Sequence, residues 1–98
     1  MLVSAAVKFQ FRDGTELMVC GARHPYCYEL FEDIKRLSPD IKSKEVTATV
    51  DGFIDDWNIF YDRYKAFEKA QEWHQLSTTT LVAKRDSLEN ELYSEDLY

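Results

Sequence analysis

The dipeptide Asp13-Gly14 lies between two runs of the chain in which apolar and polar residues alternate. In residues 7–11 the apolar side chains fall on one side of an extended chain, and the chain then returns through residues 16–20. Asp-Gly supplies the positive φ angles of a tight turn, and such alternation is typical of a half-buried strand. Pattern and turn chemistry together predict a β-hairpin over about residues 3–20.

A helix is predicted directly after this hairpin. Gly21 ends the return strand, and Pro25 has the fixed φ that suits the first turn of a helix. Apolar residues then recur at spacings of three and four over about residues 26–37, which predicts a helix that buries one stripe. The run Ser38-Pro39-Asp40 breaks it.

The second half of the chain carries weaker strand signals and a second helix. Residues 45–50 are β-branched and alternate, as in a strand, and Asp51-Gly52 is expected to turn the chain. Residues 53–61 then read as a small irregular hairpin. Asp62 is a good N-cap for a helix over about residues 63–75.

These elements predict an α+β fold, with a small, mostly antiparallel sheet and two helices packed on one of its faces. The 98 residues fit one domain, 1–98, and 45% of them are hydrophobic, which is enough for a packed core. The acidic C-terminal tail, residues 86–98, is weakly periodic, with Leu88, Leu92 and Tyr93 as the side chains that can dock on the core.

The net charge of −6 comes entirely from residues 51–98, which hold five basic and eleven acidic side chains. Such a surface repels nucleic acid backbones and attracts basic surfaces, so DNA or RNA binding is not expected. The simpler interpretation of the charge is that it keeps a small domain in solution. No apolar run approaches the length of a membrane span, and residues 1–6 lack the features of a secretory signal. We therefore expect a cytoplasmic protein with reduced thiols and no membrane partner.

Neither a metal site nor catalysis is expected. Cys20, His24 and Cys27 lie close in sequence, but structural zinc takes four ligands and His74 is isolated. The chain has no glycine-rich phosphate loop and no nucleophile beside an obvious base, apart from Cys27 near His24. A cysteine on an apolar stripe is usually a core residue, so we expect a non-enzymatic protein without a cofactor.

The residues just before the first predicted helix form a candidate binding site. Arg23 and His24 place side-chain donors beside the free backbone N–H groups of a helix start, an arrangement that suits a phosphate. The alternative, which is the commoner case, is that Arg23 pairs with a nearby carboxylate while His24 caps the helix or packs in the core.

Four stretches, taken in order, resemble a family of small phage and prophage accessory proteins. The family reads S-A-A-I-K, T-G-K-R-H, G-F-x-T followed by F-V-(D/N)-R, and S-E-D-L-(Y/W). The corresponding stretches here are Ser4–Lys8, Cys20–His24, Gly52–Ile54 with Phe60 and Asp62-Arg63 downstream, and Tyr93–Tyr98. The resemblance extends to the anti-Thoeris sponges, phage proteins that sequester cyclic ADP-ribose-type immune signals without degrading them.

The resemblance to these sponges implies a small homo-oligomeric α+β protein in the cytoplasm of an infected bacterium. It implies that Arg23 and Arg63 hold phosphates, that Phe53 and Phe60 stack on a base, and that His24 adds a hydrogen bond. The chain departs from the family pattern at Ala22, where a basic residue is usual, and in the acidic loop 55–58. Both changes weaken an anion site.

Two functions follow from these observations. The first is a sponge for a nucleotide-type immune signal, which predicts a concave, locally basic pocket completed by oligomerisation. The alternative is an antagonist that binds a host defence protein directly, as an anti-CRISPR does, through the acidic second half and exposed aromatic side chains. That alternative predicts a contiguous acidic patch and no small-molecule pocket.

Overall fold

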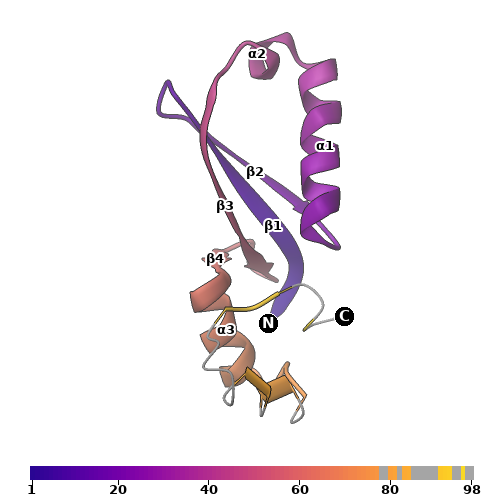
Figure 1. Cartoon of the computed structure of the whole chain (residues 1–98), viewed down its shortest axis with the longest axis vertical. Helices are drawn as coiled ribbons and strands as arrows, with labels where there is room; N and C mark the ends of the chain where they lie inside the picture. Colours follow the sequence, from indigo (N-terminus) through magenta and orange to yellow (C-terminus); the bar gives the residue numbers. More distant parts are fainter. Residues whose placement is uncertain (78–79, 82, 85–90, 94–95, 97–98) are drawn as a thin grey trace.

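The computed structural model describes residues 1–77, 80–81, 83–84, 91–93 and 96. Four strands form one antiparallel sheet in the order β2-β1-β3-β4. The strands are β1 (Leu2–Phe11), β2 (Glu16–Gly21), β3 (Val46–Asp55) and β4 (Phe60–Asp62), and the helices are α1 (His24–Leu37), α2 (Pro39–Lys42) and α3 (Arg63–Glu72) (Figure 1). The α+β class and the antiparallel sheet predicted from the sequence are confirmed.

The N-terminal hairpin, β1 and β2, forms as its sequence pattern predicts. Gly14 has a φ of +87°, which only glycine adopts without strain, and Asp13 Oδ1 accepts a hydrogen bond of 2.9 Å from Thr15 N–H. Val7 is paired with Val19 and Phe9 with Leu17 across the hairpin, so the alternation of β1 is carried into β2. The large apolar side chains of these pairs therefore lie on one face of the sheet, and the smaller pair Ala6 and Cys20 lies on the other.

Helix α1 packs on the face of the sheet that carries these large side chains. It begins at His24, two residues before the predicted start, and Pro25 occupies its first turn. Phe31 stacks on Phe9 of β1 with ring centroids 3.8 Å apart, and Cys27 is fully buried beside them. Pro39 ends the predicted helix and also opens the four-residue helix α2, which the sequence pattern did not predict.

Helix α3 begins at the predicted cap. Asp62 Oδ1 accepts a hydrogen bond of 2.8 Å from Lys65 N–H, and the helix ends at Glu72, three residues earlier than expected. Beyond the end of α3, the Gln75 side chain makes two hydrogen bonds with the backbone of Leu2. Its Oε1 accepts one of 2.7 Å from Leu2 N–H, and its Nε2 donates one of 2.9 Å to the Leu2 carbonyl. The end of α3 is thus joined to the start of β1. No helix in the described part of the chain is long and apolar enough to cross a membrane.

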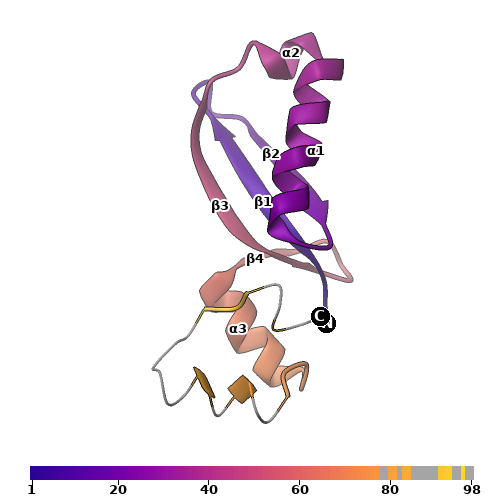
Figure 2. The same cartoon turned by 45° about the vertical axis from the view of Figure 1, so that its right-hand side comes forward.

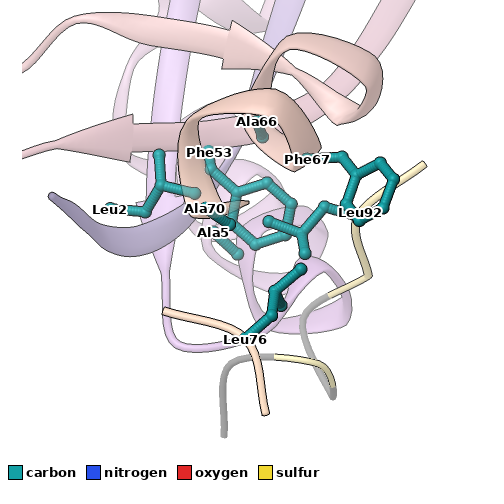
Figure 3. Packing of buried hydrophobic residues seen from close by; sticks show 8 residues of the cluster. All are labelled: Leu2, Ala5, Phe53, Ala66, Phe67, Ala70, Leu76 and Leu92. Atoms are coloured by element: carbon teal, nitrogen blue, oxygen red, sulfur yellow. The ribbon is translucent and has the colours of Figure 1, made fainter. Parts of the chain in front are cut away.

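The core has two clusters, one containing Val7 and the other Ala5. Both lie on the same face of the sheet, because Ala5 and Val7 are two residues apart in β1. One lies under α1, and the other lies between α3 and the lower end of the sheet (Figure 2). Leu92 is fully buried in the second cluster, so the predicted docking of the C-terminal region is confirmed at that residue (Figure 3). Leu88 lies outside the described residues.

The predicted turn at Asp51-Gly52 is wrong, because β3 runs without a break from Val46 to Asp55. Gly52 is needed for close packing and not for a turn. A Cβ atom there would overlap the carbonyl oxygen of Tyr61 and would meet the Phe60 ring at 2.6 Å. Local sequence cannot distinguish this use of glycine from a turn, since the Phe60 ring is brought in by the following strand.

We expect Gly52→Ala to lower the free energy of unfolding by about 1–3 kcal/mol, because β4 and the Phe60 ring must move to make room. Gly21→Ala is a matched control, since a Cβ there has its nearest contacts at 3.4–3.5 Å. It should change stability by less than about 1 kcal/mol. Urea unfolding measures both; equal effects of the two variants would contradict the packing role of Gly52.

Candidate functional site

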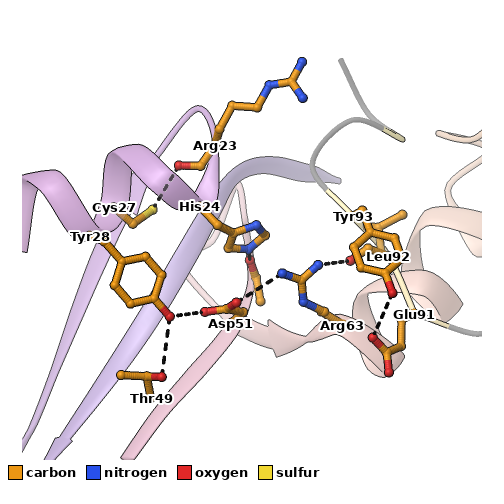
Figure 4. Close-up of polar contacts among 11 residues, drawn as sticks. Arg23, His24, Cys27, Tyr28, Thr49, Asp51, Arg63, Glu91, Leu92 and Tyr93 are labelled. Carbon is orange, nitrogen blue, oxygen red and sulfur yellow. Dashed lines mark hydrogen bonds and ion pairs between the residues drawn. The ribbon is translucent and has the colours of Figure 1, made fainter. Parts of the chain in front are cut away.

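Asp51 lies at the junction between the two core clusters. It is paired with Val7 across the sheet, so its side chain is on the face that carries the helices. The Tyr28 hydroxyl of α1 donates a hydrogen bond of 2.7 Å to Asp51 Oδ1, and Arg63 Nη2 of α3 donates one of 3.1 Å to Oδ2 (Figure 4). One carboxylate therefore connects β3 to both long helices.

Arg63 extends this network to the C-terminal region. Its Nη1 donates to the Leu92 carbonyl at 3.2 Å, its own carbonyl accepts from Leu92 N–H at 3.0 Å, and its guanidinium lies 4.8 Å from the centroid of the Tyr93 ring. The Arg63 side chain is 19% exposed. Its charge is thus already matched by Asp51, and its donors point to groups of this chain.

His24 lies on the other side of the Asp51-Gly52 segment and is buried. Its Nε2–H donates a hydrogen bond of 2.8 Å to the Gly52 carbonyl, and its ring meets Phe53 edge-on with centroids 5.2 Å apart. In this arrangement His24 joins the start of α1 to β3 as a packed residue.

The structure does not bring all five predicted ligand-binding residues to one place. His24, Phe53 and Arg63 surround the Asp51-Gly52 segment, and Phe53 is fully buried. Phe60 is paired with Ile54, so it lies on the opposite face of the sheet, where the Lys8 ammonium is 4.6 Å from its ring centroid. Arg23 is the N-cap of α1, and its side chain extends away from Arg63 (Figure 4).

A cavity of about 380 Å³ adjoins this cluster. The charged side chains in its lining are Asp51, Asp62, Arg63 and Glu91. Among the residues that the structure describes, three carboxylates against one guanidinium make the lining acidic, and that guanidinium is bound to Asp51. The cavity therefore suits a cationic group better than a phosphate.

A larger cavity, of about 670 Å³, lies between the tip of the β1–β2 hairpin and α2. The basic side chains that line it are paired, Arg12 with Glu45 at 3.1 Å and Lys44 with Asp13 at 3.2 Å. These ion pairs leave little uncompensated positive charge for an anionic ligand.

Both cysteines are poor nucleophiles. Burial raises the pKa of the Cys27 thiol to about 11, and burial also raises the pKa of Cys20. Cys27 Sγ points to the carbonyls of Ala5 and Arg23, at 3.9 and 3.6 Å. Among the residues that the structure describes, no three His, Cys, Asp or Glu side chains are grouped as a metal ion would require.

The turn between β3 and β4 presents a residue that the sequence analysis did not select. Trp57 is 81% exposed, although tryptophan is seldom left in water. Asp55, which is buried, holds the turn: its Oδ1 accepts 2.9 Å hydrogen bonds from the N–H groups of Trp57 and Ile59, and its Oδ2 accepts one of 2.8 Å from the Tyr61 hydroxyl. We call residues 55–59 the Trp57 turn. An aspartate two residues before Trp57 is the sequence signature of this turn.

The charge of Asp55 maintains the Trp57 turn. Burial opposes its ionisation, but the hydrogen bonds from Ile59, Tyr61 and Trp57 outweigh burial and hold the pKa of Asp55 below its ordinary value of 3.8. Asn58 completes the turn with a positive φ of 61°, a conformation that asparagine tolerates.

A family model described as Phage T4 y16D protein matches residues 1–98, which is the whole chain. The chain belongs to this family. Its membership confirms the resemblance to small phage proteins. Searches of curated proteins and of solved structures gave no significant match.

In this phage protein we expect Arg63→Ala to lower the free energy of unfolding by about 2 kcal/mol. The substitution leaves the Asp51 carboxylate without its charged partner and removes the side-chain hydrogen bond to the Leu92 carbonyl. Arg36→Ala is the control, because Arg36 is 74% exposed and pairs with Asp33 one helical turn away. It should cost less than about 0.5 kcal/mol. Equal losses in chemical denaturation would contradict a structural role of Arg63.

We expect the Trp57 turn to loosen at acid pH. Because the pKa of Asp55 is lower in the folded protein than 3.8, its stabilising contribution is present above pH 3.8 and is lost as the pH falls through the lowered value. In a Trp73→Phe background, the fluorescence anisotropy of Trp57 should fall over that interval. The Asp55→Asn variant should show no such transition; an identical transition in it would assign the change to other carboxylates.

Proposed function

We propose that this phage protein acts as an antagonist that binds another protein, such as a host defence protein, directly and without catalysis. The observation that carries the proposal is the Trp57 turn. The ring is 81% exposed, and the hydrogen bonds that a buried aspartate accepts fix the backbone that carries it, so little backbone conformational entropy is lost when a partner covers it. Tryptophan is among the residues most enriched at the energetic centres of protein interfaces.

The surroundings of Trp57 support this proposal. Ile59 in the same turn is 52% exposed, and Met1 is held beside the turn because its carbonyl accepts a 3.1 Å hydrogen bond from Asp56 N–H. These apolar side chains lie in a chain of net charge −6. An apolar centre on a protein of net negative charge fits a partner that has an apolar pocket and a net basic surface.

The nucleotide sponge receives less support from the geometry. A sponge needs a free ring face and unpaired guanidinium groups, whereas Phe53 is in the core and Arg63 is bound to Asp51. The cavity beside Arg63 is acidic. A sponge that uses Phe53 and Arg63 requires this cluster to rearrange, while a protein antagonist requires no change in it.

The test is capture of a partner from lysate of a bacterial host, with the purified protein as bait and with quantitative crosslinking. We expect Trp57→Ala to weaken capture roughly tenfold or more, since a central interface tryptophan contributes most of its energy through its buried ring. Leu37→Ala is the control: Leu37 is 80% exposed at the far end of α1, so its loss should leave capture unchanged.

The same preparation should be heated with cyclic ADP-ribose isomers, ADP-ribose and cyclic dinucleotides. A sponge for any of these signals would show a rise in Tm, because ligand binds the folded state only. A clear rise, together with capture that is equal in Trp57→Ala and wild type, would overturn the antagonist in favour of the sponge.

A further inference from the structure

Half of β3 forms an unprotected edge of the sheet. The strand has ten residues, but β4 has three and pairs only with Gly52–Ile54. From Val46 to Asp51 no strand of the described part of the chain lies on the outer side of β3, which runs along the left margin of the sheet in Figure 2. Burial along β3 changes at the same point, from exposed at residues 46–49 to buried at residues 52–55.

The backbone of this edge presents hydrogen-bonding groups outward. Asp55 N–H donates to the Ile59 carbonyl, so the backbone groups of Asp55 face the β4 side. In a regular strand the backbone N–H and C=O groups of every second residue point to the same neighbouring strand. Asp51 and Thr49 are four and six residues before Asp55, so their N–H and C=O groups also point outward. These groups match the ladder of an added strand.

The side chains of the edge do nothing to prevent such pairing. Residues 46–50 read Val-Thr-Ala-Thr-Val, with high β propensity and without charge, proline or glycine. Natural proteins usually protect an exposed edge with lysine, proline or a bulge. This edge has neither lysine nor proline, but its pairing with β1 shifts where Gln10 lies opposite Ala48 and Phe11 opposite Val46, which leaves Thr47 as an extra residue. The regular part of the edge is therefore Ala48–Asp51. An open, uncharged edge in a protein with net charge −6 is therefore a feature that needs an explanation.

The acidic cavity of about 380 Å³ lies where this edge meets the end of β4, since its lining includes Thr49 and Asp62. The chain leaves the sheet after Asp62 to begin α3, so the line that β4 follows is open beyond that residue. A strand that continues this line, antiparallel to β3, starts opposite Asp51. Its first residue lies beside the carboxylates of Asp51, Asp62 and Glu91 and the guanidinium of Arg63, which is paired with Asp51. The two remaining carboxylates favour a basic side chain.

We propose that the edge Val46–Asp51 is a strand-addition site for an extended segment of a partner protein that carries Lys or Arg at its N-terminal end. The segment pairs antiparallel with β3 and its cation enters the acidic cavity. Main-chain hydrogen bonds provide affinity in this mode of recognition, and the charged end provides direction and register. The inference rests on the protein-binding function proposed above, but it does not use the Trp57 turn.

The test is an NMR titration with the amidated peptide Lys-Thr-Val-Thr-Val-Thr and with a peptide that has Glu in place of Lys. The Lys peptide should shift the amide signals of residues 46–51 and should bind roughly three times more tightly than the Glu peptide. Thr49→Pro removes the outward N–H at a position where an edge strand tolerates proline, and it should weaken binding about tenfold. Thr49→Ala removes the same hydroxyl, keeps the N–H and should bind like wild type.

A third variant tests the charge. Glu91→Gln should reduce the preference for the Lys peptide, while Trp57→Ala should leave peptide binding unchanged, so failure of this inference and failure of the antagonist are distinguishable. Equal binding by folded Thr49→Pro and Thr49→Ala, or no shift at millimolar peptide, would overturn the inference. Self-association that Thr49→Pro abolishes would also overturn it, because the edge would then belong to a second copy of this chain.

Discussion

The ion pair between Arg63 and Asp51 is the contact on which the arrangement of the two cores depends. Asp51 faces the helix-covered side of the sheet, where an unpaired carboxylate would lose its hydration without compensation. Arg63 supplies the opposite charge from the start of α3, and Tyr28 supplies a hydroxyl from α1. The two helices pack on different clusters, so this network is what sets their positions relative to one another on the sheet.

The same ion pair bears on what the protein can bind. A guanidinium that already holds a carboxylate, a backbone carbonyl and an aromatic ring has few donors left for a phosphate. Two of the exposed groups are of a different kind: the ring of Trp57 and the backbone edge of β3 over residues 46–50, which carry no charge. Both fit the polypeptide binding proposed above, and they lie at opposite ends of one strand.

Local patterns were sufficient to predict the elements whose stability is local. The hairpin depends on Asp13-Gly14, and α3 depends on the Asp62 cap, and both were predicted close to their observed bounds. Asp51-Gly52 has a similar local pattern, but its conformation is decided by the Phe60 ring and the Tyr61 carbonyl, which reach it only after β4 has paired. The faces of Phe53 and Phe60 depend on the same long-range pairing, because Phe60 lies opposite Ile54 and therefore on the other face of the sheet from Phe53.

For the candidate site, the sequence indicated residue types but not their partners. Arg63 was identified as a cation at a helix start, yet its partners come from residues 51 and 92, which no local pattern connects to it. His24 was left open between ligand binding and packing, and the structure places it against Phe53 and the Gly52 carbonyl. The Trp57 turn was detectable in principle, because Asp55 stands at the position of an Asx-turn aspartate.

The bonds between Gln75 and Leu2 have a consequence for the order in which the protein is built. They join residues 73 positions apart, and they supply both backbone partners of the second residue in the chain. Contacts of such sequence separation form late and slowly, because a long loop must close first. During synthesis the hairpin and α1 can assemble while the start of β1 still lacks its partner. We therefore expect the β1–β2 hairpin and α1 to fold first, and the contact between Leu2 and the residues after α3 to form only once Gln75 has left the ribosome.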